Sequence, residues 1–189
     1  PSFDIFFSKL FQNENGNFLL QRYYFNIEIL NYNRGISLTI LFRKLSLAIM
    51  IIYIFVLPFF SKISFIQKLY FGHIFKLNEI VLLWLSSLVG LIIVINLLFK
   101  NFWGRARPNE IIDFGGINNF TPWYQITDQC INNCSFVSGD SSVGFALIIF
   151  YFLVNKITYL WIALIFGFGL GLLRIMEGGH FISDIVLSG

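Results

Sequence analysis

The sequence predicts an all-α membrane protein, a bundle of spanning helices that forms a single domain over residues 1–189. Of its 189 residues, 57% are hydrophobic and only 12% are charged. A soluble domain does not need so many apolar side chains, because much of its own surface must face water. Long apolar runs that could cross a bilayer also recur along the chain. We therefore expect a polytopic membrane helix bundle.

The first segment, residues 1–35, mixes aromatic side chains with polar and charged ones. Such a segment is more typical of the membrane interface than of a spanning helix. The numbered chain begins at Pro1 rather than at a methionine, and it stops at Gly189 shortly after a new helix has begun. We therefore expect a further spanning helix beyond each end.

Four apolar runs then predict spanning helices, and a fifth helix begins at the end of the chain. The first run contains Arg43 and Lys44, whose long side chains can reach the interface from inside a helix. Gly167, Gly169 and Gly171 are spaced two residues apart in the last complete run, and we expect them to let a neighbouring helix pack closely. The expected helices cover residues 36–60, 78–99, 140–155, 157–174 and the start of a helix at 180–189.

The charges of the connections predict the orientation. The connection at 61–77 carries three lysines, which favours the cytoplasmic side. Counting crossings from there places the long polar loop at 100–139 and the turn from Arg174 to His180 together on the outer face. In a bacterium this orientation means a multi-pass protein of the inner (cytoplasmic) membrane, with these segments facing the periplasm.

Cations gather on this outer face. Lys100, Arg105 and Arg107 lie within eight residues at a helix exit, and Arg174 lies on the same side. Arginine binds phosphoryl oxygens through its planar fork, so the group can neutralise a phosphate. The alternative is that these side chains only anchor helix ends at the interface or form a satisfied ion pair.

Reactive and small residues accompany these cations. His180 can attack or transfer protons, and Asp184, four residues later, can fix its tautomer. Because Gly178-Gly179 should end the preceding helix, we expect His180 and Asp184 on one face of the next helix. Ser138 and Gly139 precede another helix, whose first backbone N–H groups can receive an anion.

The two cysteines, Cys130 and Cys134, are too few for a metal site without nearby histidines. They can form a disulfide if their loop faces an oxidising compartment, and two free thiols remain the alternative. No basic run with interleaved aromatics is present, so we expect no nucleic-acid partner.

Three segments resemble the signature of the type 2 phosphatidic acid phosphatase superfamily. Lys100 is followed after six residues by Arg107-Pro108, a Ser-Gly motif follows at Ser138, and Arg174 precedes His180 and Asp184 at the family's spacing. The resemblance implies a six-helix membrane phosphatase without metal or other cofactor, acting on a phosphorylated membrane lipid. It also implies that His180 forms a phosphohistidine and that Asp184 orients it. The phosphate-binding residues it implies are Lys100, Arg107, Arg174, Ser138 and Gly139.

Asp140 departs from the family pattern, which usually has histidine there as the acid that protonates the leaving group. A carboxyl group beside cations gives up its proton easily, so Asp140 is either an unusual acid or a group that orients His180 or a basic residue. Together with the sequence around His180, this segment most resembles the 4′-phosphatase branch of bacterial lipid A phosphatases. The alternatives are an undecaprenyl pyrophosphate, phosphatidylglycerophosphate or phosphatidic acid phosphatase, a phosphate-lipid binding protein without turnover, and a structural or transport protein.

Overall fold

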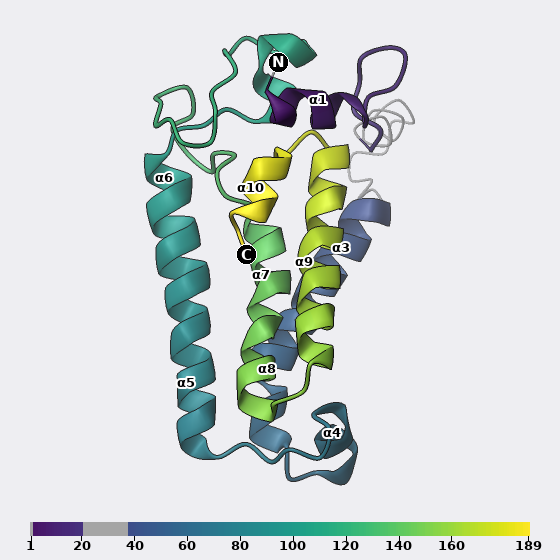
Figure 1. Cartoon of the computed structure of the whole chain (residues 1–189), viewed down its shortest axis with the longest axis vertical. Coiled ribbons are helices and arrows are strands. Elements are labelled where there is room, and N and C mark those ends of the chain that lie inside the picture. The colour runs from purple at the N-terminus through teal and green to yellow at the C-terminus, as the bar shows by residue number, and fades with distance from the viewer. Residues whose placement is uncertain (1, 21–37) are drawn as a thin grey trace, which may run out of the picture.

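The computed structural model describes residues 2–20 and 38–189, and the described residues form helices and turns without a β-strand (Figure 1). Residues 21–35 of the expected interfacial segment, and the expected start of the first span at residue 36, lie outside the described residues. The helices are α1 (Phe3–Lys9), α3 (Leu38–Phe55), η1 (Leu57–Phe60), α4 (Ser64–Leu69), α5 (Leu77–Leu88), η2 (Val89–Phe99), α6 (Lys100–Phe102), η3 (Pro108–Glu110), η4 (Ile112–Phe114), α7 (Gly139–Phe145), η5 (Ala146–Ile148), α8 (Ile149–Val154), α9 (Thr158–Met176) and α10 (Ile182–Val186).

Two helices in the described residues are long and apolar enough to cross a membrane. They are the continuous helix Leu77–Phe102, formed by α5, η2 and α6, and the single helix α9. The helix Gly139–Val154 is apolar but shorter. The large side chains exposed along α3, α5 and α9 are hydrophobic, for example Leu45, Leu85 and Ile165, which suits contact with lipid. The molecule is an all-α membrane helix bundle, as the sequence predicts.

Some helix ends differ from the prediction. The helix expected to reach residue 60 has α3 ending at Phe55, and the short 3-10 helix η1 follows it. The helix expected to end at residue 99 continues to Phe102, so Lys100 lies on its last turn and not in the loop. The turn that follows depends on Gly104, which has a φ of +66° and whose added Cβ would lie 1.6 Å from Thr127 O. Only glycine fits this conformation and this approach.

Helices α7 and α9 pack closely along their length. A Cβ added at Gly144 would lie 2.6 Å from Gly167 N, and one at Gly171 would lie 2.6 Å from Ser141 Oγ. The prediction of close packing is therefore confirmed for Gly167 and Gly171. It is wrong for Gly169, whose Cβ would meet nothing within 4 Å because that residue faces away from the neighbouring helices.

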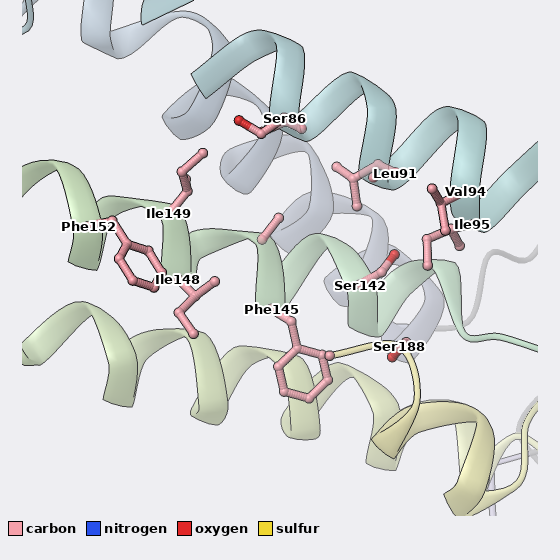
Figure 2. Close-up of a pocket in the computed structure, with 14 residues that line it drawn as sticks. Ser86, Leu91, Val94, Ile95, Ser142, Phe145, Ile148, Ile149, Phe152 and Ser188 are labelled. Carbon is pink, nitrogen blue, oxygen red and sulfur yellow. The ribbon is translucent and has the colours of Figure 1, made fainter. Parts of the chain in front are cut away.

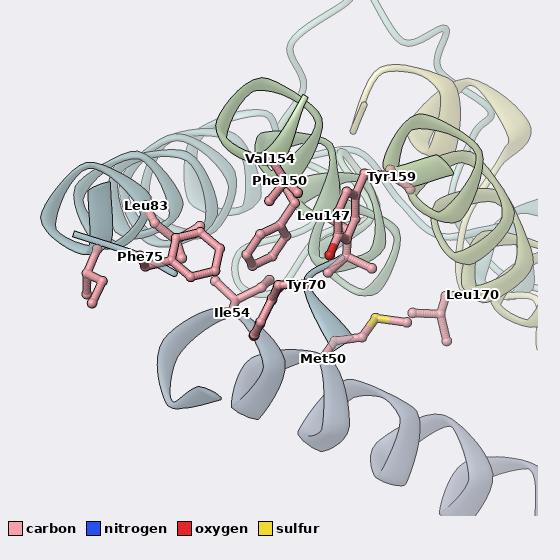
Figure 3. Packing of buried hydrophobic residues seen from close by; sticks show 12 residues of the cluster. Met50, Ile54, Tyr70, Phe75, Leu83, Leu147, Phe150, Val154, Tyr159 and Leu170 are labelled. Atoms are coloured by element: carbon pink, nitrogen blue, oxygen red, sulfur yellow. The ribbon is translucent and has the colours of Figure 1, made fainter. Parts of the chain in front are cut away.

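The main hydrophobic core lies toward the α4 end of the bundle (Figures 1 and 3). The connection between α3 and α5 contributes Tyr70 and Phe75 to it, both buried. The Tyr70 hydroxyl donates to Tyr53 O at 2.6 Å, and its ring lies 5.4 Å from that of Phe150. The opposite end of the bundle carries α1, α6, α10 and the long polar loop (Figure 1). The aromatic core thus holds the helices at one end while the polar segments meet at the other.

Candidate active site

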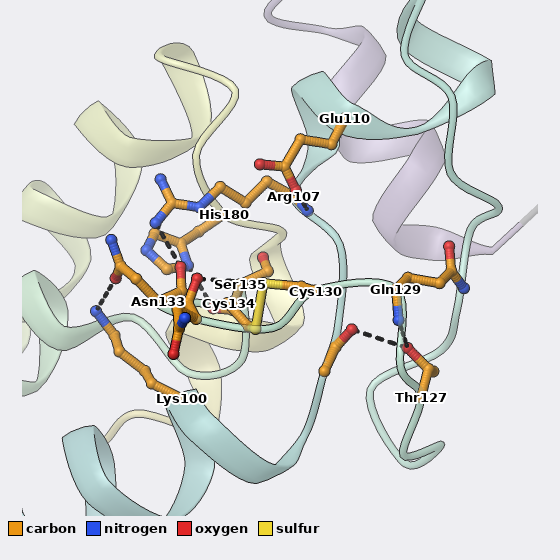
Figure 4. The surroundings of a disulfide bond; sticks show 12 residues. Lys100, Arg107, Glu110, Thr127, Gln129, Cys130, Asn133, Cys134, Ser135 and His180 are labelled. Atoms are coloured by element: carbon orange, nitrogen blue, oxygen red, sulfur yellow. Dashed lines mark hydrogen bonds between the residues drawn. A yellow bond between two sulfur atoms is a disulfide. The ribbon is translucent and has the colours of Figure 1, made fainter.

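Lys100 and Arg107, the first and last cations of the first motif, both contact Asn133 (Figure 4). Lys100 Nζ donates to Asn133 Oδ1 at 3.3 Å, and Arg107 Nη2 donates to Asn133 O at 2.7 Å. A disulfide between Cys130 and Cys134 closes the turn that carries Asn133. Of the two alternatives for the cysteines, the structure has the disulfide, and this disulfide restrains the residue that binds both cations.

The second motif begins helix α7 beside Lys100. Ser138 is fully buried, and its Oγ accepts from Ser141 N at 3.4 Å as the helix N-cap. This contact uses the oxygen and leaves the hydroxyl hydrogen free to donate. A Cβ added at Gly139 would lie 3.2 Å from Lys100 Nζ, so the missing side chain leaves room beside the ammonium group. An anion beside Gly139 would meet Lys100, whereas the fully buried Ser138 hydroxyl would reach it only after the side chains around it move.

His180 lies in the turn between α9 and α10, with 2% of its surface exposed. The prediction that His180 and Asp184 share a helix face is wrong, because α10 begins only at Ile182 and Asp184 caps its first turn by accepting from Phe181 N at 2.9 Å. His180 Nδ1 lies 2.6 Å from Ser135 O and 3.7 Å from Asp184 Oδ2.

These distances assign the tautomer of His180. A carbonyl oxygen can only accept a hydrogen bond, so Nδ1 carries the hydrogen and Nε2 carries the lone pair. Burial lowers the pKa of His180 to about 4, and the positive charges of Arg174 and Lys100 act in the same direction, while Asp184 partly offsets them. His180 is therefore a neutral imidazole near pH 7, the form that can attack an electrophile.

Arg174 and Asp140 belong to a cluster of alternating charges. Arg174 Nε lies 3.5 Å from Asp140 Oδ2, and Arg174 Nη1 pairs with Glu177. Arg43 of α3 pairs with Asp140 and lies 3.4 Å from Glu177 Oε1. Sequence reasoning missed Arg43 and expected it to reach the interface. The sequence offers one indication of this pair: Arg43 and Asp140 both lie near the outer ends of their predicted helices, at the same level of the bundle.

Gly179 lets the Arg174 guanidinium group of this cluster lie next to His180. A Cβ added at Gly179 would lie 2.7 Å from Arg174 Nη2, so the guanidinium group packs directly on the turn that precedes His180. Burial and then the nearby charge of Arg174 lower the pKa of Arg107. Like charges are therefore close together in this cluster, and an anion between them would be stabilised.

Arg105, the third cation of the first motif, is not available to an anion in this region. Its side chain is completely buried, and its guanidinium group pairs with Asp184 at 2.5 Å and Asp4 at 2.8 Å. Arg105 and Arg107 lie two residues apart in the same motif, and the sequence does not indicate that Arg105 is buried while Arg107 reaches Asn133. Asp4 was likewise missed, because its partner lies 101 residues away in the sequence.

An apolar pocket of about 380 Å³ lies apart from these charges, between α5–η2 and the helix Gly139–Val154 (Figure 2). Its lining includes Leu91, Ile95, Phe145 and Ile149, with no charged side chain. The pocket therefore does not provide the phosphate-binding groups. Within residues 2–20 and 38–189, no three side chains of the His, Cys, Asp and Glu types gather as a metal site would require.

Comparison with known proteins agrees with the three motifs. The model of the PAP2 superfamily matches residues 81–189. Lipid A 4'-phosphatase of Francisella tularensis subsp. novicida (strain U112) is 44% identical over 105 residues, which cover 53% of this chain and 47% of that protein. The proteins of the same name from Rhizobium leguminosarum and Rhizobium etli (strain ATCC 51251 / DSM 11541 / JCM 21823 / NBRC 15573 / CFN 42) are 32% and 30% identical, over 54% of this chain and 45% and 41% of their own lengths.

The matched region spans about half the length of these curated relatives. No solved structure gives a significant match. The family model covers more than half of the chain and includes all three motifs and His180. The chain therefore belongs to the PAP2 superfamily.

Proposed function

We propose that this chain carries the catalytic site of a membrane lipid phosphatase that removes the 4′-phosphate of lipid A or of a similar glycolipid. The observation that carries the proposal is His180, a buried neutral imidazole with its lone pair on Nε2, which follows a turn against which the guanidinium group of Arg174 packs. The substrate class is supported by the three relatives, each named lipid A 4'-phosphatase.

In the first step, the phosphate binds between Lys100, Arg107 and Arg174. The Ser138 hydroxyl and the backbone N–H of Gly139 add donors, and all five groups stabilise the charge that spreads over the phosphoryl oxygens. His180 Nε2 gives its electron pair to phosphorus while the bond from phosphorus to the lipid oxygen breaks. The lipid leaves as an alcohol after its oxygen takes a proton, and a phosphohistidine remains.

In the second step, water attacks phosphorus and the P–N bond breaks. The electron pair returns to Nε2, the water loses a proton, and inorganic phosphate leaves. Throughout the cycle, Ser135 O accepts from Nδ1 and holds the ring, and Asp184 holds Ser135 through its hydroxyl at 2.5 Å.

Asp140 acts in this scheme by positioning cations. Its carboxylate pairs with Arg43 and lies 3.5 Å from Arg174 Nε. An ionised carboxylate has no proton to give, so the leaving oxygen takes its proton from water. Arg43 then completes the cationic surroundings of the phosphate from α3.

The site faces the outer, periplasmic side of a bacterial inner membrane in this proposal. The lysine-bearing connection 61–77 lies at the opposite end of the bundle from the site (Figure 1), as expected if that end is cytoplasmic. The disulfide lies at the site end, and disulfides persist in oxidising compartments such as the periplasm.

The test is phosphate release by the full-length protein in detergent with a chelator present. The substrates are lipid A with phosphates at positions 1 and 4′, undecaprenyl pyrophosphate, phosphatidylglycerophosphate and phosphatidic acid. We expect chelator-resistant release from the 4′ position, its loss in His180→Ala, and its retention in His73→Ala, which changes the other histidine of the chain. Preference for another lipid would reassign the substrate. Binding of lipid without release from any of them would contradict a phosphatase.

A further inference from the structure

Arg105 occupies the centre of a buried hydrogen-bond network behind the site. Its side chain is fully buried, and its guanidinium carbon lies 4.2 Å from the centre of the Phe181 ring. Its nitrogens donate to Thr121 O at 2.9 Å, Ser183 Oγ at 2.9 Å, Asp184 Oδ1 at 2.5 Å and Asp4 Oδ2 at 2.8 Å. A guanidinium group with this many fixed acceptors is held in one orientation.

Asp4 brings the N-terminal helix α1 into this network. It is 5% exposed, and its Oδ1 accepts from Ser183 N at 3.0 Å. Its Oδ2 accepts from both Ser183 Oγ at 2.7 Å and Arg105. Asp4 thus contacts the first turn of α10 through Ser183 as well as the cation. It lies far outside the region that the family model matches, residues 81–189.

Consecutive hydrogen bonds connect Asp4 to His180. Arg105 joins Asp4 to Oδ1 of Asp184. The other carboxylate oxygen, Oδ2, accepts from Ser135 Oγ, and the carbonyl oxygen of that same serine accepts from His180 Nδ1. Each residue in this series is buried, so loss of one contact would leave a group unpaired away from water.

We propose that Asp4 and Arg105 are positioning residues for the nucleophile, which fix the ring of His180 through Asp184 and Ser135. Without the Asp4 carboxylate, Arg105 loses an ionic partner and Ser183 loses both of its acceptors on α1. The start of α10 and the carboxylate of Asp184 then shift, and the Ser135 carbonyl moves with them. The consequence for catalysis rests on the proposed function, whereas the consequence for the His180 ring does not.

The test compares Asp4→Asn with Glu14→Gln, which changes an exposed carboxylate in the same segment. The chain has two histidines, so ¹⁵N-histidine labelling gives few signals, and His73→Ala assigns them. In the wild type we expect His180 with a hydrogen-bonded Nδ1–H and an unprotonated Nε2. We expect Asp4→Asn to shift or broaden these resonances and Glu14→Gln to leave them unchanged.

A kinetic measurement accompanies the spectra. We expect the rate of phosphoenzyme formation to fall roughly tenfold to a hundredfold in Asp4→Asn, because small displacements of a reacting group have effects of this size. The amplitude of phosphoenzyme, which counts correctly folded molecules, and the KM should stay close to the wild-type values. Ser183→Ala removes the Ser183 Oγ contacts with Asp4 and Arg105 without changing a charge, and it should shift the His180 resonances in the same direction if Asp4→Asn does not fold.

Unchanged His180 resonances in both folded variants would overturn the proposal. So would a reduced phosphoenzyme amplitude with an unchanged rate, because Asp4 would then only hold α1 against α10. If the wild type releases no phosphate from any lipid, the proposed function fails, and the resonances still decide whether Asp4 positions His180.

Discussion

The residue that separates this chain from the usual family pattern is Asp140. Where that pattern has a histidine to protonate the leaving group, this chain has a carboxylate that pairs with Arg43 and Arg174. The residue that replaces the usual histidine thus pairs with a cation from a different helix, Arg43 of α3. In the proposed mechanism, this pairing gives Asp140 an electrostatic role in placing the cations instead of an acid role.

Asp140→Asn tests which role holds. We expect about a tenfold loss of kcat, because Arg43 and Arg174 lose the group that aligns them. The loss should be equal for a phosphorylated lipid and for p-nitrophenyl phosphate, whose leaving group needs no proton. The control is Asp113→Asn, an exposed carboxylate in η4 of the long polar loop. A loss confined to the lipid substrate would show that Asp140 is an acid after all.

The sequence identifies the residues of this site whose positions the local chain determines. Lys100 and Arg107 are separated by a fixed spacing, and Arg174 and His180 flank one turn, so the motif predicts each of them. It does not predict the partners of Asp140 or Arg105. Those partners lie 97 residues away for Arg43 and 101 for Asp4, and such pairs depend on how the helices pack.

At the scale of the elements, the contact between α7 and α9 depends on glycine. Gly144→Ala would bring a Cβ within 2.6 Å of Gly167 N, a backbone atom that cannot move aside alone. We expect it to destabilise the protein by about 1–3 kcal/mol, the usual effect of overpacking. Thermal unfolding of the purified protein in detergent measures this change.

Gly169→Ala is the matched control for that variant. It adds the same methyl group to α9 at a position where nothing lies within 4 Å. Alanine favours a helix over glycine by about 1 kcal/mol, so the unfolding temperature should stay the same or rise. Equal destabilisation by the two substitutions would show that the loss does not come from contact between α7 and α9.

Apolar runs predict which segments are helical but not where each helix ends. The helices Gly139–Val154 and Thr158–Met176 begin and end within two residues of the expected bounds. The ending at Phe102 and the start of α10 at Ile182 depend instead on Gly104 and on the Asp184 cap. Such turns and caps are set by backbone conformation and hydrogen bonds, to which hydrophobic patterning is insensitive.

At the scale of the whole molecule, the main packed core and the candidate site lie at opposite ends of the helix bundle. The aromatic core is built around the connection that carries α4, through Tyr70 and Phe75, while Lys100 lies on α6 and His180 just before α10, two elements at the opposite end of the bundle (Figure 1). Residues from Asp4 to Asp184 contribute to that end, so the site depends on segments outside the matched region 81–189 as well as within it. We infer that residues 81–189 alone would bind phosphate less well and would hold His180 less firmly.

The central claim is that His180 carries the phosphoryl group. The most direct test is to mix the wild type with lipid A labelled with ³²P at the 4′ position, quench within milliseconds in alkali, and digest the protein. We predict a labelled peptide containing His180 that is stable in alkali and loses its label in acid, as expected for a phosphohistidine, and no such peptide in His180→Ala. Release of the 4′-phosphate at the wild-type rate by His180→Ala would contradict the account.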